Sequence, residues 1–136
     1  MAAIYSEPVP ENRRMDFINQ LFGLDFPLRI EPTIYGNASR LSSDYGGGVW
    51  EFYALSNGGF YMAPRSGTSF SALCENGYEG TLSADAFGMT ACLYAFSHLS
   101  FSNDERFAGT CAAHFQTLRE FALDHQQARA ISAAID

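Results

Sequence analysis

The chain has 136 residues, 47% of them hydrophobic and 15% aromatic, which excludes intrinsic disorder and fits one domain with a substantial core. Its formal net charge is −7 and all eight basic residues are Arg, so the polybasic surface of a nucleic-acid-binding protein is absent. The sequence has neither an uninterrupted apolar run of about 18 residues nor a basic-then-apolar start, so we expect no membrane span and no signal peptide, and a cytoplasmic protein.

The first ten residues are predicted to form an extended arm because of their two prolines. The segment from Glu11 to Phe22 has apolar residues at helical spacing, and Gly23 directly after it is typical of a helix C-terminus. The expected buried stripe consists of Met15, Ile18, Leu21 and Phe22. Arg13 and Arg14 lie outside that stripe, so we expect both in solvent.

A second short helix is predicted from Thr33 to about Ser43, after an apolar link over residues 25–31. Pro32 can open this helix because the first turn does not need its missing N–H. Gly36 opposes the prediction, since Gly disfavours helix interiors. The side chains expected to face inward are Ile34, Ala38 and Leu41.

The stretch from Tyr45 to Pro64 holds the only Trp and is rich in aromatic residues, which suit a half-buried strand surface. Within it, Asn57-Gly58 indicates a two-residue type I′ hairpin turn, which needs positive φ at both positions. This turn would pair Leu55 with Phe60, Ala54 with Tyr61, Tyr53 with Met62 and Phe52 with Ala63. Both faces of such a hairpin are apolar, so we expect it inside the protein, covered on two sides.

A second hairpin is predicted from Ser69–Cys74 and Tyr78–Leu82 around Asn76-Gly77, after a polar loop over residues 65–68. Four antiparallel strands in succession indicate a meander. We therefore expect an α+β fold, with a small antiparallel β-meander of about four strands packed with several α-helices in a single domain, residues 1–136.

A central helix is predicted from Ala84 to Leu99, with Ser83 as its N-cap and Asp85 in the first turn, where the helix dipole favours an acid. This helix is apolar on nearly every side, so it should be buried. Its small residues are Ala84, Gly88, Ala91, Cys92 and Ala95, and those of the next helix are Ala108, Gly109, Ala112 and Ala113. We expect these two small faces to let the two helix backbones approach closely.

The next helix is predicted from Asp104 to about His125, with Asn103 as its cap. Its expected inward residues are Phe107, Cys111, Phe115, Leu118 and Ala122. One or two final amphipathic turns over residues 126–136 should dock through Ile131 and Ile135.

Three Cys and three His form the one combination that could indicate a nucleophilic enzyme. Cys74, Cys92 and Cys111 all lie in apolar patterns, where a free Cys packs as a small hydrophobe. Their odd number and wide spacing favour free thiols in a reducing compartment. No CxxC or HxxxH spacing occurs, so we predict no metal and no cofactor. A small cysteine-dependent enzyme remains the alternative.

The chain resembles the ArdB/KlcA antirestriction protein family over nearly its whole length. The longest matching run is residues 45–64, Tyr-Gly-Gly-Gly-Val-Trp-Glu-Phe-Tyr-Ala-Leu-Ser-Asn-Gly-Gly-Phe-Tyr-Met-Ala-Pro. Residues 83–86 with 91–100, and 118–123 with 133–136, also match. The resemblance implies a plasmid- or mobile-element-borne protein that alleviates cleavage of incoming DNA by type I restriction–modification enzymes while sparing methylation. It further implies an action other than DNA mimicry, and it supplies no catalytic residues.

Five residues are candidates for contact with a partner: Asn76, Ser83, Asp85, Ile135 and Asp136. Asn76 and Ser83 also have turn and capping roles, whereas Asp136 is either an acidic contact point held by Ile135 or part of a frayed tail. We expect a protein partner, with the host type I restriction–modification enzyme as the candidate, contacted directly or indirectly. Neither direct nucleic-acid binding nor a membrane is expected. An acidic DNA mimic that inhibits a DNA-binding enzyme is the second alternative, although Arg residues are interspersed among the acids.

Overall fold

The structure, a computed structural model, describes residues 3–65 and 67–136. Met1 and Ala2 of the predicted arm and Ser66 of the predicted polar loop lie outside the described residues. In chain order the elements are β1 (Ser6–Pro8), a 3-10 turn (Glu11–Arg13), α1 (Arg14–Leu21), a π-helical turn (Phe26–Ile30), α2 (Glu31–Leu41), β2 (Trp50–Leu55), β3 (Phe60–Pro64), β4 (Ser69–Leu73), β5 (Glu79–Ser83), α3 (Ala84–Leu99), α4 (Glu105–Ala122) and α5 (Ala128–Ile135). The α+β class is confirmed.

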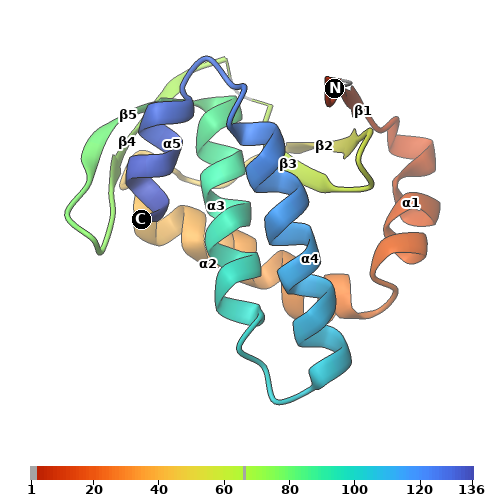
Figure 1. Cartoon of the computed structure of the whole chain (residues 1–136). Helices are drawn as coiled ribbons and strands as arrows, with labels where there is room; N and C mark the ends of the chain where they lie inside the picture. Colours follow the sequence, from red (N-terminus) through yellow and green to blue (C-terminus); the bar gives the residue numbers. More distant parts are fainter. Residues whose placement is uncertain (1–2, 66) are drawn as a thin grey trace.

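Helix α3 lies at the centre of the fold, with α2, α4, α5, β3 and the β4–β5 hairpin packed around it (Figure 1). Its bounds are those predicted, and the Ser83 hydroxyl caps it by accepting a hydrogen bond from the Ala86 N–H at 3.1 Å. Large side chains on every side of α3 are buried, including Phe87, Met89 and Phe96. The predicted central position of this helix is therefore confirmed.

Helix α3 packs closely against α4, as predicted, but its small residue Gly88 meets a strand and not the small residues of α4. A Cβ atom added at Gly88 would lie 2.4 Å from the Ala63 Cα atom, so β3 rests directly on the α3 backbone. The small residues Gly109, Ala112 and Ala113 of α4 are exposed instead. Helix α4 turns its large apolar side chains inward, because burying them removes more apolar surface from water.

The four predicted strands form, but they divide between two sheets and do not make one meander. One sheet has the order β1-β2-β3 and the other consists of β4 and β5. The N-terminal arm supplies β1, which pairs antiparallel with β2 at the sheet edge. The second hairpin packs on α3, where the rings of Phe70 and Phe87 stack with centroids 4.4 Å apart. Burying Phe70 in this way fixes the hairpin against the helix instead of against β3.

The register of the β2–β3 hairpin differs by one residue from the prediction. Tyr53 pairs with Tyr61, because the loop has three residues, 56–58, where two were predicted. Within this loop only Gly58 has positive φ, +90°, so Asn57 does not adopt the left-handed conformation that a type I′ turn requires.

This one-residue difference exchanges the faces of β3, since side chains alternate along a strand. Phe60 and Met62 share a face with Trp50 and Phe52, whereas Tyr61 shares the other face with Tyr53. All of β3 is buried, as predicted, while β2 is half-buried at several positions.

Four local predictions near the helix ends are wrong. Met15 is 76% exposed, so it is not part of the buried stripe of α1. Arg14 is half-buried, with its guanidinium carbon 4.6 Å above the Phe52 ring and an ion pair to Glu51 at 3.3 Å.

The predicted apolar link over residues 25–31 is a π-helical turn that runs directly into α2. Helix α4 is capped by Asp104, not Asn103.

Other helix predictions are confirmed, although α2 begins two residues earlier than predicted and α4 ends at Ala122. Gly23 follows α1 with φ +60°, and Ile34, Ala38 and Leu41 of α2 are buried. Helix α5 docks through Ile131, which is 1% exposed. None of the described helices has the length and apolar character needed to cross a membrane.

Candidate functional site

The five predicted contact residues fall into two groups, one at each end of α5. At the start of α5, the Gln127 side-chain oxygen accepts a hydrogen bond from the Ser83 N–H at 2.8 Å. At its end, Asn76 contacts backbone carbonyls of the last turn. An eight-residue helix is about 12 Å long, so two separate groups result. We call them the Asp85 cluster (Tyr61, Ser83, Asp85, His125, Gln127) and the Asn76 clasp (Asn76, Tyr94, Ala133, Ala134).

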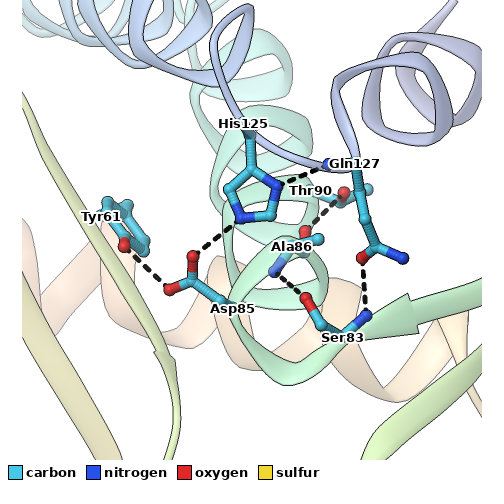
Figure 2. Close-up of polar contacts among 7 residues, drawn as sticks. All are labelled: Tyr61, Ser83, Asp85, Ala86, Thr90, His125 and Gln127. Atoms are coloured by element: carbon cyan, nitrogen blue, oxygen red, sulfur yellow. Dashed lines mark hydrogen bonds and ion pairs between the residues drawn. The ribbon is translucent and has the colours of Figure 1, made fainter. Parts of the chain in front are cut away.

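The carboxylate of Asp85 is the centre of the Asp85 cluster (Figure 2). One oxygen accepts a hydrogen bond from the Tyr61 hydroxyl at 2.8 Å, and the other lies 2.9 Å from His125 Nε2. The side chain of Asp85 is 41% exposed, whereas that of His125 is 15% exposed. The carboxylate therefore joins β3, α3 and the segment between α4 and α5 at a position that solvent still reaches.

The hydrogen bonds of His125 fix its tautomer. Its Nδ1 accepts from the Gln127 N–H at 2.9 Å, so the ring proton lies on Nε2 and is donated to Asp85. Both ring nitrogens are thus occupied. A general base needs a free nitrogen within hydrogen-bond reach of its substrate, so this His–Asp pair is arranged as a brace between helices and not as a catalytic dyad.

Tyr61 is held as a neutral hydrogen-bond donor. Burial, followed by the neighbouring Asp85 charge, raises the pKa of its phenol far above the ordinary value. Its ring stacks between those of Tyr53 and Phe121, at centroid distances of 4.7 and 5.9 Å. Burial also raises the pKa of Tyr53. Neither phenol supplies a phenolate near neutral pH.

The sequence predicted Ser83 and Asp85 but not His125, Gln127 or Tyr61 as members of this cluster. Asp85 and His125 are 40 residues apart. Their contact depends on where α4 ends relative to the start of α3, which no local pattern encodes. Tyr61 is 2% exposed, as expected for a hairpin inside the protein, but its hydroxyl reaches Asp85.

The Asn76 clasp fastens the last turn of α5. The Asn76 side-chain oxygen accepts from the Tyr78 N–H at 2.9 Å, while its Nδ2 donates to the Ala133 carbonyl at 2.9 Å. The Tyr94 hydroxyl donates to the Ala134 carbonyl at 2.5 Å. The frayed-tail interpretation of residues 133–136 is therefore wrong.

The loop between β2 and β3 is joined to a helix by an Asn side chain in the same way. Asn57 accepts from the Gly59 N–H at 3.1 Å and donates to the Thr117 carbonyl of α4 at 2.9 Å. In both loops, the Asn side-chain oxygen accepts a hydrogen bond from within the loop, and the side-chain nitrogen donates to a backbone carbonyl of a helix. A carbonyl oxygen has two lone pairs, so it can accept this second hydrogen bond.

The last two residues separate into an anchor and an exposed acid. Ile135 is half-buried and packs on the core, whereas Asp136 is exposed and its N–H donates to the Ser132 carbonyl at 3.0 Å. The Asp136 carboxylate thus lies at an ordered helix end.

The three thiols lie where nucleophilic chemistry is disfavoured. All are buried, and burial raises the pKa of Cys92 to about 12 and that of Cys111 to about 11, and also raises that of Cys74. A reactive Cys needs a lowered pKa, because the thiolate is the nucleophile. Burial lowers the pKa of His114 to about 4, and its ring packs 4.6 Å from that of Phe22. Within residues 3–65 and 67–136, no group of three His, Cys, Asp or Glu side chains is placed to hold a metal.

Several acidic side chains are paired with Arg. Glu51 contacts both Arg14 and Arg65, and Arg65 also reaches Glu11 at 3.2 Å. Arg29 lies 3.5 Å from Asp104. A DNA mimic needs a dense row of unpaired acids, and this part of the surface alternates acids with bases instead.

The chain is similar to known proteins over most of its length. The model of a family described as "Antirestriction protein" matches residues 43–136. The antirestriction protein KlcA of Escherichia coli is 40% identical over 134 residues, which cover 94% of this chain and 92% of that protein. YafX of Escherichia coli strain K12, an uncharacterized protein, is 38% identical over 133 residues, covering 95% of this chain and 86% of YafX.

One solved structure is similar to the whole fold. It superposes with a TM-score of 0.91 at 38% sequence identity and covers 99% of this chain and 96% of its own. It comes from a study of the KlcA and ArdB proteins, which describes a novel fold and antirestriction activity against type I DNA restriction systems in vivo but not in vitro.

Proposed function

The chain belongs to the antirestriction protein family, and from this premise we propose that it alleviates DNA cleavage by type I restriction–modification systems. The main support for this function is that the fold agrees over nearly the full length with a solved structure from the KlcA and ArdB study, at 38% sequence identity. Fold alone does not imply function, but here the sequence is shared as well as the fold. The protein would act in the cytoplasm and protect incoming plasmid or mobile-element DNA.

A plating experiment tests this function. Unmodified phage is plated on cells that carry a type I system, with and without this gene, and methylation of host DNA is measured in parallel. We expect plating to rise by orders of magnitude while methylation stays unchanged. Plating that does not rise, in cells that contain the folded protein, would reject the proposal.

We further propose that the protein acts without catalysis, through a protein partner. The buried thiols with raised pKa values and the fully engaged ring of His125 support this proposal. The KlcA and ArdB study reports activity in cells only, which favours an action that needs a component of the cell besides the restriction enzyme and its DNA. The proposed target is the host type I enzyme, contacted directly or through such a further component.

Replacing the thiols tests the absence of catalysis. Cys74, Cys92 and Cys111, each changed singly to Ala, should lower the free energy of unfolding by about 1–2 kcal/mol per buried site. Restriction alleviation should persist in each variant that folds, because the thiols serve packing only. Loss of all alleviation in one variant with an unchanged circular dichroism spectrum and melting temperature would restore the cysteine-enzyme alternative.

The exposed acid at the C-terminus tests the contact surface. Asp136→Ala should leave the melting temperature within a few degrees, because the side chain is exposed. It should weaken alleviation, since we propose that Asp136 contacts the partner from the fastened end of α5. Asp124→Ala is the matched control, an exposed acid that follows α4 and should keep full activity. Equal activity of the two variants would remove Asp136 from the contact surface.

A further inference from the structure

A cavity of about 360 Å³ opens between three elements that meet beside the Asn76 clasp. Asn37 and Arg40 line it from the end of α2, Glu75 from the β4–β5 loop, and Tyr94 and His98 from the last turns of α3. This volume is within the range of small-molecule pockets. No residue of the Asp85 cluster lines this cavity, and the proposed antirestriction function does not use the cavity.

Asn37 is the residue in this cavity that packing does not explain. It is 7% exposed, and its side-chain oxygen accepts a hydrogen bond from Arg40 Nη2 at 2.6 Å, which fixes the orientation of the amide. Its Nδ2 is buried and has no hydrogen-bond partner among the described residues. Leaving a buried donor unpaired costs about 1–3 kcal/mol, so an apolar residue here would be the more stable choice. A donor retained at such a cost is typical of a site that a ligand completes.

The charged side chains around Asn37 indicate the charge of the ligand that the cavity would bind. Arg40 forms no ion pair among the described residues, in contrast to Arg14, Arg29 and Arg65. Its guanidinium lies against the Asn37 amide, so two planar groups offer N–H donors side by side. Arg40 and Glu75 both line the cavity, and one positive charge together with one negative charge favours a monoanion over a dianionic phosphate.

We propose that this cavity binds a carboxylate group, which accepts hydrogen bonds from Asn37 and Arg40 together. The carboxylate belongs either to a small organic acid or to the end of a polypeptide. Tyr94 lines the same cavity and holds the Ala134 carbonyl, so an occupied cavity also supports the fastened end of α5. The proposal concerns binding by the purified protein and stands or falls independently of restriction alleviation.

An NMR titration tests the site. The ¹⁵N-labelled full chain at pH 7 receives sodium acetate, with sodium chloride at equal ionic strength as the reference. We expect saturable shifts in the Asn37 side-chain amide, the Arg40 Nε–H and the backbone of residues 73–75. Inorganic phosphate should produce weaker shifts. N-acetyl-Ala-Ala with a free carboxylate, compared with its amide, identifies a polypeptide end if it binds more tightly than acetate, and a small free acid if it does not.

Two variants and a control make the titration decisive. Asn37→Leu should abolish the saturable shifts while the melting temperature stays equal or rises, and Arg40→Gln should abolish them in a folded protein. Arg119→Gln, at an exposed position on α4, should bind acetate as the wild type does. Shifts no larger than those in chloride, or shifts that persist in both cavity variants, would overturn the proposal and leave Asn37 paired with water alone.

Discussion

Gly88→Ala is expected to lower the free energy of unfolding by about 3 kcal/mol or more. The added Cβ would lie 2.4 Å from the Ala63 Cα and 2.5 Å from the Met62 carbonyl oxygen. Both are backbone atoms of β3, which cannot move aside without breaking its pairing with β2. Chemical denaturation monitored by circular dichroism measures the change.

Gly109→Ala is the matched control for this prediction. Gly109 also lies inside a helix, but a Cβ there would meet nothing within 4 Å. Because Ala is the better helix former, this variant should gain about 1 kcal/mol. Similar effects of the two substitutions would mean that β3 does not lie against the α3 backbone at Gly88.

His114 should make the protein sensitive to mild acid. Its pKa is lowered by burial to about 4, whereas an unfolded His titrates near 6.5. Between these values the unfolded chain binds a proton that the folded chain excludes, so stability falls as pH falls. From pH 7 to pH 4, the loss attributable to His114 is about 3 kcal/mol.

The measurement compares urea unfolding of the wild type with that of His114→Phe and His114→Gln at pH 7 and pH 4. Both variants lack the titrating ring, so each should lose about 3 kcal/mol less than the wild type between the two pH values. The Phe variant keeps the aromatic contacts with Phe22 and Phe96, and the Gln variant keeps a polar group. Identical pH dependence in all three proteins would contradict the buried, neutral state of His114.

The helices could be predicted from periodicity because their buried apolar side chains recur at helical spacing within a short stretch of sequence. Helix α3 has apolar residues on nearly every side and a Ser at its N-cap, so its bounds follow from the sequence. The hairpins were also predictable, since Asn-Gly marks both loops. Loop length was not, because a three-residue loop with one positive-φ Gly uses the same Asn-Gly pair as a two-residue loop.

Long-range polar contacts could not be predicted from one sequence. The bond between Asn76 and the Ala133 carbonyl and that between Asp85 and His125 join residues 57 and 40 positions apart. The first depends on how α5 lies against the β4–β5 hairpin, and the second depends on where α4 ends relative to the start of α3. The residues themselves were visible as polar groups at turns and ends, so the sequence indicated Asn76, Ser83 and Asp85 but not their partners.

Restriction alleviation by this protein is measured by plating unmodified phage on a type I restricting host. Three strains are compared: one with the wild-type gene, one with Gly88→Ala and one with an empty vector, with the folded protein quantified in each. The proposed function predicts a rise of orders of magnitude for the wild type and a much smaller rise for the Gly88 variant, in proportion to its folded fraction. Wild-type plating equal to the empty vector, with the folded protein abundant, would contradict it.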